Sequence, residues 1–256
     1  MYSFNICISD IIINIQTEFE NMHKAYKDYI TQESQADFSV TITSDDLKNI
    51  KERLLNLGTS WVHDDTPLHN FKQIAIYEKI APLLLDHNSL LFHGSAIVFQ
   101  ENVYIFTGKS GTGKTTHCRW FTKNIKGSYY LNGDKPLLRF KENEVLACGT
   151  PWRGKENFGC NKTLPLKAIC LIRRSKQNAM RRATSSEAVT FLLEQCLIPG
   201  ELPSIRKTLT FVQRLIKKID IYILECNISD EASALSFETL TGLHFNSYSR
   251  PPVQLN

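Results

Sequence analysis

A glycine-rich segment of this chain reads Gly108-Lys109-Ser110-Gly111-Thr112-Gly113-Lys114-Thr115. It fits the pattern G-x-x-x-x-G-K-[ST] of a phosphate-binding P-loop. An apolar run at residues 103–106 comes before it, and a helical pattern over residues 115–124 comes after it. Because a P-loop joins a strand to a helix, this context predicts an α/β fold whose central mixed β-sheet carries the loop.

The chemistry of such a loop is the binding of nucleotide phosphates together with a metal ion. Glycines let the backbone wrap closely around phosphate oxygens, and the start of a helix presents unpaired amides and a partial positive charge. Lys114 is expected to reach the β and γ phosphates of ATP, and the Thr115 hydroxyl to ligate Mg²⁺. The alternative is a glycine-rich turn without a ligand. The residues expected to hold the nucleotide are Gly108, Lys109, Ser110, Gly111, Thr112, Gly113, Lys114, Thr115 and Thr116.

A second metal ligand is expected at the end of another strand, where many P-loop proteins carry an aspartate. The candidate is Asp134, which follows the strand-like residues 129–132. The alternative is that Asn132 and Gly133 form a hairpin turn and that Asp134 is an ordinary turn residue.

A second segment, His93-Gly94-Ser95-Ala96, lies one hairpin upstream of the P-loop. Together with the sequence GKSGTGKTT, it resembles the core of HPr kinase/phosphorylase and of ATP-dependent phosphoenolpyruvate carboxykinase. The resemblance covers roughly residues 89–174, and the remainder only in outline. It implies that His93 sits beside the transferred phosphate, near the metal or hydrogen-bonded to an acidic pair. From the residue alone, a structural histidine inside the hairpin is the favoured interpretation.

The chain departs from that family at the acidic pair, because Gly133-Asp134 stands where the family has two consecutive acids. One carboxylate can hardly hold the metal and also accept the proton of the acceptor hydroxyl. Either Asp134 is the base while Thr115 and phosphate hold the ion, or Glu156 or His93 takes the proton. The departure also weakens any expectation of the reverse, phosphorylase reaction.

A loop dense in glycine and charge spans residues 149–159 and reads GTPWRGKENFG. Its cations Arg153 and Lys155 are suited to neutralising charge on the transferred phosphoryl group or to gripping an anionic acceptor. The resemblance implies a glycine-rich, arginine-containing segment in about this place. The alternative is a turn with solvated charges.

The rest of the chain is predicted to form a small N-terminal α/β layer, residues 1–86, before the P-loop core, residues 87–256. Ser44 is expected to cap a helix that Gly58 ends, and Pro82 to kink or break the next one. Strands are predicted at residues 4–8, 11–15, 37–43, 90–99, 102–107, 129–132, 136–140, 145–148, 168–172 and 221–225. Helical patterns cover residues 18–30, 45–57, 71–85, 115–124, 186–197, 204–218 and 229–240.

The composition limits the classes of partner that the chain is expected to bind. The net charge of +4 comes from 30 basic and 26 acidic residues, and it gives no field of the kind that drives nucleic-acid or membrane binding. The N-terminus has no signal-peptide pattern, no run is apolar enough to span a membrane, and seven scattered cysteines indicate reduced thiols, so a cytoplasmic location is expected. The pairs Arg173-Arg174 and Arg181-Arg182 are read as rimming the site or as solvated, and the tryptophans as packing residues.

The expected function is a phosphotransferase that uses ATP and Mg²⁺ and phosphorylates a serine-type hydroxyl of a peptide or protein. A free amino acid or another small molecule is a second acceptor class. A third hypothesis is a nucleotide-binding regulator without catalysis. Carboxykinase chemistry is disfavoured because no carboxylate-binding and second-metal set is evident beyond His93 and Asp134. A homo-oligomer is left open.

Overall fold

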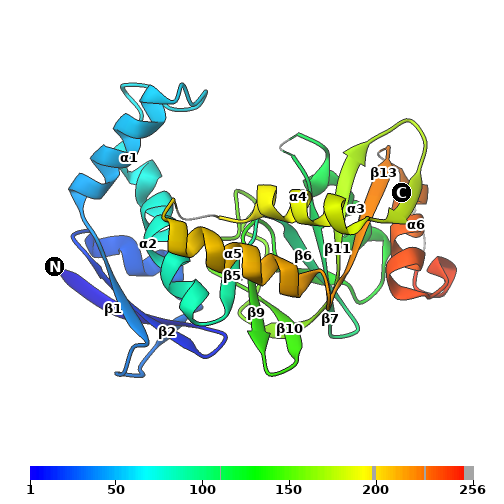
Figure 1. Cartoon of the computed structure of the whole chain (residues 1–256), viewed down its shortest axis with the longest axis horizontal. Helices are drawn as coiled ribbons and strands as arrows, with labels where there is room; N and C mark the ends of the chain where they lie inside the picture. Colours follow the sequence, from blue (N-terminus) through cyan, green and yellow to red (C-terminus); the bar gives the residue numbers. More distant parts are fainter. Residues whose placement is uncertain (110, 198–199, 228, 251–256) are drawn as a thin grey trace, which may run out of the picture.

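Two β-sheets organise the chain in the computed structural model, which describes residues 1–109, 111–197, 200–227 and 229–250 (Figure 1). One sheet has four strands in the order β3-β1-β2-β4 and belongs to the N-terminal layer. The other has nine strands and contains both parallel and antiparallel pairs. The fold is therefore mixed α/β, as predicted. Ser110, one of the expected P-loop residues, lies outside the described residues.

The N-terminal layer is a twisted sheet with helices packed on one side. Strands β1 and β2 pair as an antiparallel hairpin, and β4 runs parallel to β2. Alternation along β2 buries Ile11, Ile13 and Ile15, which face the helices as a strand with one buried face requires. The elements are β1 (Tyr2–Ile8), β2 (Ile11–Thr17), η1 (Glu20–Tyr26), β3 (Ile30–Thr31), β4 (Phe38–Ile42), α1 (Ser44–Asn56), η2 (Leu68–Phe71) and α2 (Lys72–Asp86).

Three predictions for this layer need correction. Residues 18–30 do not form an α-helix: Glu20–Tyr26 is a short 3₁₀-helix, and Ile30 pairs with Ile6 in the sheet. The pattern read as an α-helix comes from side chains that fill the core. Thr43, and not Ser44, caps α1, because its hydroxyl accepts from the Asp46 amide in a capping box. Helix α2 continues through Pro82 without a break.

The large sheet has β7 near its middle. Strand β7 runs parallel to β11, which also runs parallel to β13, while β6 and β8 continue the sheet antiparallel on the other side. The elements are β5 (Ser89–Leu91), β6 (Ser95–Phe99), β7 (Asn102–Thr107), α3 (Lys114–Asn124), β8 (Tyr129–Asn132), β9 (Leu137–Lys141), β10 (Glu144–Cys148), β11 (Thr163–Arg174), β12 (Ala179–Arg182), α4 (Ser185–Gln195), α5 (Leu202–Leu215), β13 (Asp220–Cys226), α6 (Asp230–Thr241) and η3 (Phe245–Ser247).

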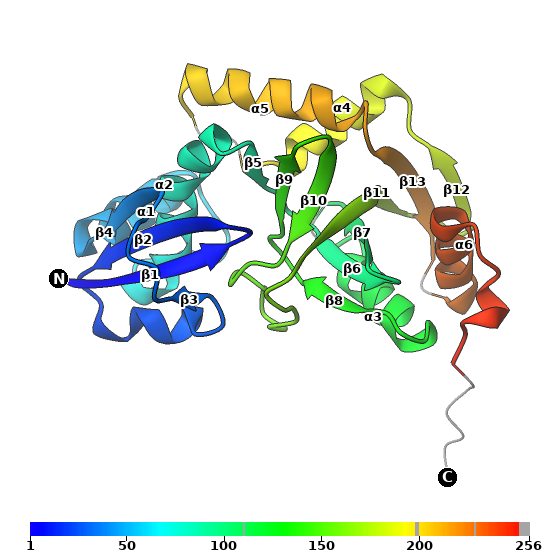
Figure 2. The same ribbon diagram turned by 90° about the horizontal axis from the view of Figure 1, so that it is seen from below.

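Helices cover both faces of this sheet, as Figure 2 shows for α4 and α5 on one side and α3 and α6 on the other. Strand β7 serves both cores, because Val103 and Ile105 face α4 and α5 whereas Tyr104 and Phe106 face α3 and α6. A strand buried on both faces reads as a continuous apolar run, which is how this one reads in the sequence.

Two predictions for the core need correction. The run 90–99 is not one strand: β5 pairs with β9, β6 pairs with β7, and the chain changes partner between them. A Cβ on Gly94 would lie 2.7 Å from Ile105 Cγ2, so this crossing needs a residue without a side chain. Strand β12 was not predicted, and Arg181 and Arg182 lie on it at the edge of the sheet beside β13.

The N-terminal layer packs against the end of the large sheet. Its apolar core takes in Leu91, Leu137, Cys148 and Trp152 from the larger unit, and Tyr77 meets Trp152 edge-on with ring centroids 5.4 Å apart. The predicted boundary at residue 86 falls between α2 and β5 and stays a prediction. Within the described ranges, the helices are too short or too polar to cross a membrane.

Candidate functional site

The segment predicted to be a P-loop, residues 108–115, leads from the buried strand β7 into α3, and it is called the P-loop below for its sequence pattern. The chain turns at Gly108, and Gly113 precedes the helix in a left-handed conformation with φ of +97°. Among the described residues, no side chain caps α3. The amides of its first turn therefore remain available for an anion, which is what phosphate binding at a helix start requires.

A cavity of about 500 Å³ opens in front of this helix. Its walls come from the P-loop, from the turn after β8 and from the loop of residues 149–159, called here the Arg153 loop. The structure thereby brings together most of the site residues predicted from sequence: His93, Lys109, Gly111, Gly113, Lys114, Thr115, Thr116, Asp134, Arg153, Lys155 and Glu156. Gly108 does not line this cavity, and Thr112 lines a neighbouring one.

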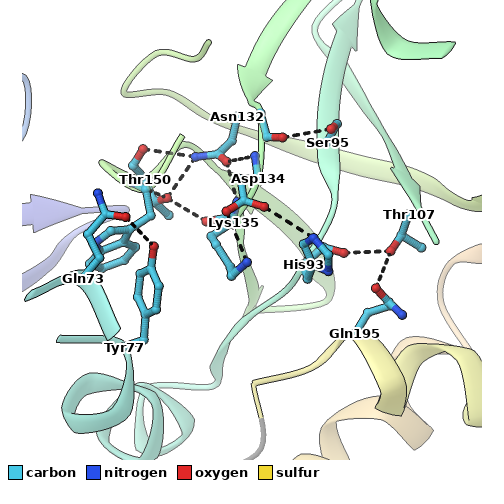
Figure 3. A network of polar contacts seen from close by, with 12 residues as sticks. Gln73, Tyr77, His93, Ser95, Thr107, Asn132, Asp134, Lys135, Thr150 and Gln195 are labelled. Carbon is cyan, nitrogen blue, oxygen red and sulfur yellow. Dashed lines mark hydrogen bonds and ion pairs between the residues drawn. The ribbon is translucent and has the colours of Figure 1, made fainter. Parts of the chain in front are cut away.

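Three predicted residues meet at the base of the cavity. The Lys114 ammonium group donates to His93 Nε2 over 2.8 Å. The same ring nitrogen lies 3.4 Å from Asp134 Oδ1 (Figure 3). A backbone bond reinforces the arrangement, because the Gly94 amide donates to the Asp134 carbonyl over 2.9 Å. His93 is therefore part of the polar cluster that surrounds the P-loop lysine.

Charge decides how this cluster is protonated. Burial, together with the positive charges of Lys114 and Lys135, lowers the pKa of His93 to about 4. The ring is therefore neutral at neutral pH, and its contact with Asp134 is not an ion pair there. Since Nε2 accepts from Lys114, the ring proton belongs on Nδ1. Burial also lowers the pKa of Lys114.

The turn that carries Asp134 is built by a buried asparagine. Asn132 Oδ1 accepts from the amides of Asp134 and Lys135 at 2.9 and 2.8 Å, and its Nδ2 donates to the Thr150 hydroxyl at 2.9 Å (Figure 3). Strand β8 pairs with β6, whereas β9 pairs with β5 and β10, so this is not a hairpin turn. A turn closed by a side chain in this way fixes the backbone of Asp134, from which its carboxylate extends.

Gly133 is the position at which the resemblance noted in the sequence would place the first of two consecutive acids. A Cβ there would lie 2.7 Å from the Arg153 carbonyl oxygen and 3.3 Å from that of Phe158. The Gly133 amide also donates to the Phe158 carbonyl over 2.9 Å. The Arg153 loop therefore occupies the space that a second carboxylate would need.

Gln195 is a supporting residue that the sequence did not reveal. Its backbone carbonyl accepts from the His93 amide over 2.8 Å, and its side-chain Oε1 lies 3.1 Å from the buried hydroxyl of Thr107. That hydroxyl donates to the His93 carbonyl over 2.7 Å (Figure 3). Gln195 is the last residue of α4 and lies far from His93 in the sequence. Because its contacts with His93 and Thr107 are long-range, no local sequence motif marks it.

Two of the three charged residues of the Arg153 loop pair with protein partners. Arg153 pairs with Asp28 of the N-terminal layer over 2.9 Å, and its guanidinium lies 5.5 Å from the centre of the Tyr29 ring. Glu156 pairs with Arg119 of α3 over 2.5 Å. The prediction that Arg153 faces a phosphoryl group and the suggestion of Glu156 as a base both stay predictions, and these contacts compete with both roles.

An aromatic pair on the cavity wall was also missed. Tyr130 and Phe158 stack with ring centroids 4.8 Å apart, and both line the cavity. The Tyr130 hydroxyl is buried and has no hydrogen-bond partner among the described residues. Burial raises its pKa, so the hydroxyl stays protonated and able to donate. The sequence signal that could have indicated this pair is a Phe within a glycine-rich loop.

Two oxygen-bearing residues of the cavity fit a magnesium ion that arrives with phosphate. Mg²⁺ keeps several waters and takes one or two carboxylates together with substrate phosphates, and Thr115 and Asp134 line the same cavity. Across the described ranges, His, Cys, Asp and Glu form no cluster of three or more that would hold a metal ion. These ligands are typical of a metal ion that is bound jointly by the protein and the substrate phosphates, and not of a site in which the protein supplies every ligand.

No family model matches the chain, and no curated protein matches it either. Among solved structures, similarity is found to the HPr(Ser) kinase/phosphatase from Coxiella burnetii, with 12% sequence identity and a TM-score of 0.35. The match covers 59% of this chain and 93% of that chain. This is a distant likeness between folds, and the chemistry of this chain has to be read from its own site.

Proposed function

We propose that the protein is a phosphotransferase that takes the γ-phosphoryl group of ATP, with Mg²⁺, and transfers it to a serine-type hydroxyl. The observation that carries the proposal is the meeting of Lys114, His93 and Asp134 in one cavity at the start of α3. Phosphoryl transfer needs little covalent help from the enzyme, because position and charge provide most of the catalysis. This cavity combines a lysine, a carboxylate and free helix amides at one place.

Each residue of the cluster has a role in this proposal. Lys114 exchanges its bond to the neutral His93 for one to a phosphate oxygen, which is the stronger, charge-assisted interaction. Thr115 and Asp134 hold Mg²⁺ together with phosphate, and the ion neutralises phosphate charge when bound. His93, neutral at working pH, is able to accept the proton of the acceptor hydroxyl.

The acceptor is proposed to be a peptide or protein hydroxyl, with a free amino acid or another small molecule as the second class. The wall formed by Tyr130 and Phe158 supports a peptide, because a stacked aromatic pair provides apolar contact for a side chain of the acceptor. Lys155, exposed beside them, is suited to an acidic group of the acceptor.

One observation favours a second function. The crowding at Gly133 leaves the site with Asp134 as the one carboxylate beside His93, and a nucleotide-binding regulator needs no base. In that case ATP binding orders the surrounding loops without transfer of phosphate.

The test is transfer from γ-labelled ATP with Mg²⁺ to a panel of serine peptides, serine-containing proteins and free serine. Lys114→Ala and Asp134→Asn are run beside the unmodified protein. We expect label on a hydroxyl, and a loss of at least about 100-fold in both variants. ATP binding without transfer to any acceptor would favour the regulator. Transfer that survives both substitutions would place the chemistry elsewhere.

A further inference from the structure

A second cavity, of about 230 Å³, lies beside the P-loop. It is bounded by Thr112 and Gly113 of the loop, by Trp120 of α3, and by residues that follow β11 and β13. Nothing in the proposed phosphate chemistry uses this space. Its position and walls indicate what it holds.

The position follows from the topology of the sheet. Strands β7, β11 and β13 are parallel neighbours, so their carboxyl ends lie along one edge. Arg174 ends β11, and Asn227 follows β13, and both line this cavity. In open α/β sheets, ligands bind outside the carboxyl ends of parallel strands. Asp134, by contrast, follows β8 on the opposite side of β7.

The two cavities adjoin at the P-loop. Gly113 and Arg174 line both of them. A single ligand can therefore place a polyphosphate group in the first cavity and a bulkier group in the second. Helix α3 gives the direction, because Thr116 lines the first cavity and Trp120, one helical turn further on, lines the second.

The walls of the second cavity are suited to a flat ring. Trp120 is half-buried and presents an aromatic side chain, while Ile172 and Cys226 form an apolar floor. Arg174 and Asn227 supply polar groups at the rim. Among the described lining residues, none is acidic. Stacking on an aromatic ring with a polar rim is how proteins commonly hold a nucleobase.

We infer that this cavity binds the base and ribose of the nucleoside triphosphate whose phosphates lie on the P-loop. The inference rests on the proposed function, because it needs a nucleotide at the P-loop. It assigns the nucleoside to the β11 and β13 side and leaves the Asp134 side to the acceptor. Trp120, read from sequence as a packing residue, becomes a binding residue.

The experiment compares ATP with inorganic tripolyphosphate, which carries the phosphates without the nucleoside. Calorimetry with Mg²⁺ measures both ligands on the unmodified protein, on Trp120→Ala and on Trp120→Leu, which keeps apolar volume without the ring. Trp120→Phe keeps an aromatic ring, and Trp61→Ala removes a tryptophan that lines neither cavity.

We expect Trp120→Ala and Trp120→Leu to weaken ATP binding about tenfold and to leave tripolyphosphate binding unchanged. Trp120→Phe and Trp61→Ala should bind ATP as the unmodified protein does. Unchanged ATP affinity in Trp120→Leu, with tripolyphosphate still bound, overturns the inference and leaves the proposed function standing. If the unmodified protein binds neither ligand, the proposed function fails, and the inference fails with it.

Discussion

The P-loop and the Arg153 loop form two walls of one cavity, but different contacts hold them in place. The P-loop lies between a buried strand and a helix that are its direct neighbours in the chain. The Arg153 loop is held by Asp28, which lies between η1 and β3 of the N-terminal layer, and by the turn around Gly133. The difference teaches that a local motif encodes the proposed phosphate site, whereas long-range packing shapes the wall opposite.

The Arg153 loop and the two residues that follow it, Cys160 and Asn161, contact the N-terminal layer at several points. Beside the ion pair of Arg153 and Asp28, the Asn161 side chain donates to the Asp28 carbonyl over 3.0 Å. The Tyr29 hydroxyl donates to the Cys160 carbonyl over 3.3 Å. The N-terminal layer thus bears directly on one wall of the candidate active site.

The largest expected effect contrasts one lysine from each wall. Lys114→Ala removes the cation that the proposal places at the phosphates, and we expect transfer to fall by at least about 100-fold. Lys155→Ala removes an exposed cation of the Arg153 loop and should cost less than about tenfold. Initial rates of phosphate transfer measure both. Equal losses would remove the distinction between the two walls.

The next effect concerns the contact between the Arg153 loop and the turn that carries Asp134. In Gly133→Ala, the added methyl meets the Arg153 carbonyl, and we expect unfolding free energy to fall by about 1–3 kcal/mol. Urea unfolding of the variant measures this.

Gly200→Ala is the matched control, because a Cβ there meets nothing within 4 Å. Its urea midpoint should stay close to that of the unmodified protein. A Gly133→Ala variant as stable as this control would show that the loop moves aside easily, and room for a second acid would then exist.

The smallest effect tests the link to the N-terminal layer. Asp28→Asn removes the charge that pairs with Arg153, whose side chain is 11% exposed while that of Asp28 is 46% exposed. A half-exposed pair of this kind contributes up to about 1 kcal/mol, so we expect the KM for the acceptor to rise about fivefold. The KM for ATP should not change, since the Asp28 carboxylate pairs with Arg153 of the Arg153 loop and not with the P-loop.

Asp45→Asn is the control, because Asp45 forms an exposed pair with Lys48 on α1 and touches neither wall. It should leave both KM values unchanged. A rise in the KM for ATP in Asp28→Asn would mean that the N-terminal layer also supports the P-loop, contrary to the comparison.

Most of the regular elements could be predicted from the sequence, because their signals are local. Period-two alternation in β2 and the helical pattern over residues 45–57 are examples, since side-chain patterning within one element decides them, although the cap is Thr43 and not Ser44. Strand β12 and the break after β5 could not be predicted, because each depends on which strand the segment pairs with. The 3₁₀-helix at η1 was misread for a similar reason.

The amino-acid sequence by itself determined where the proposed phosphate-binding loop lies, because glycines, lysine and threonine occur at the fixed spacing of the P-loop pattern between a strand and a helix. Only the tertiary structure decided which partners surround it. His93 meets Lys114, Arg153 pairs with Asp28, and Gly133 is closed off by a loop that lies apart from it in the chain. Such contacts join residues distant in sequence, and sheet pairing and core packing bring them together.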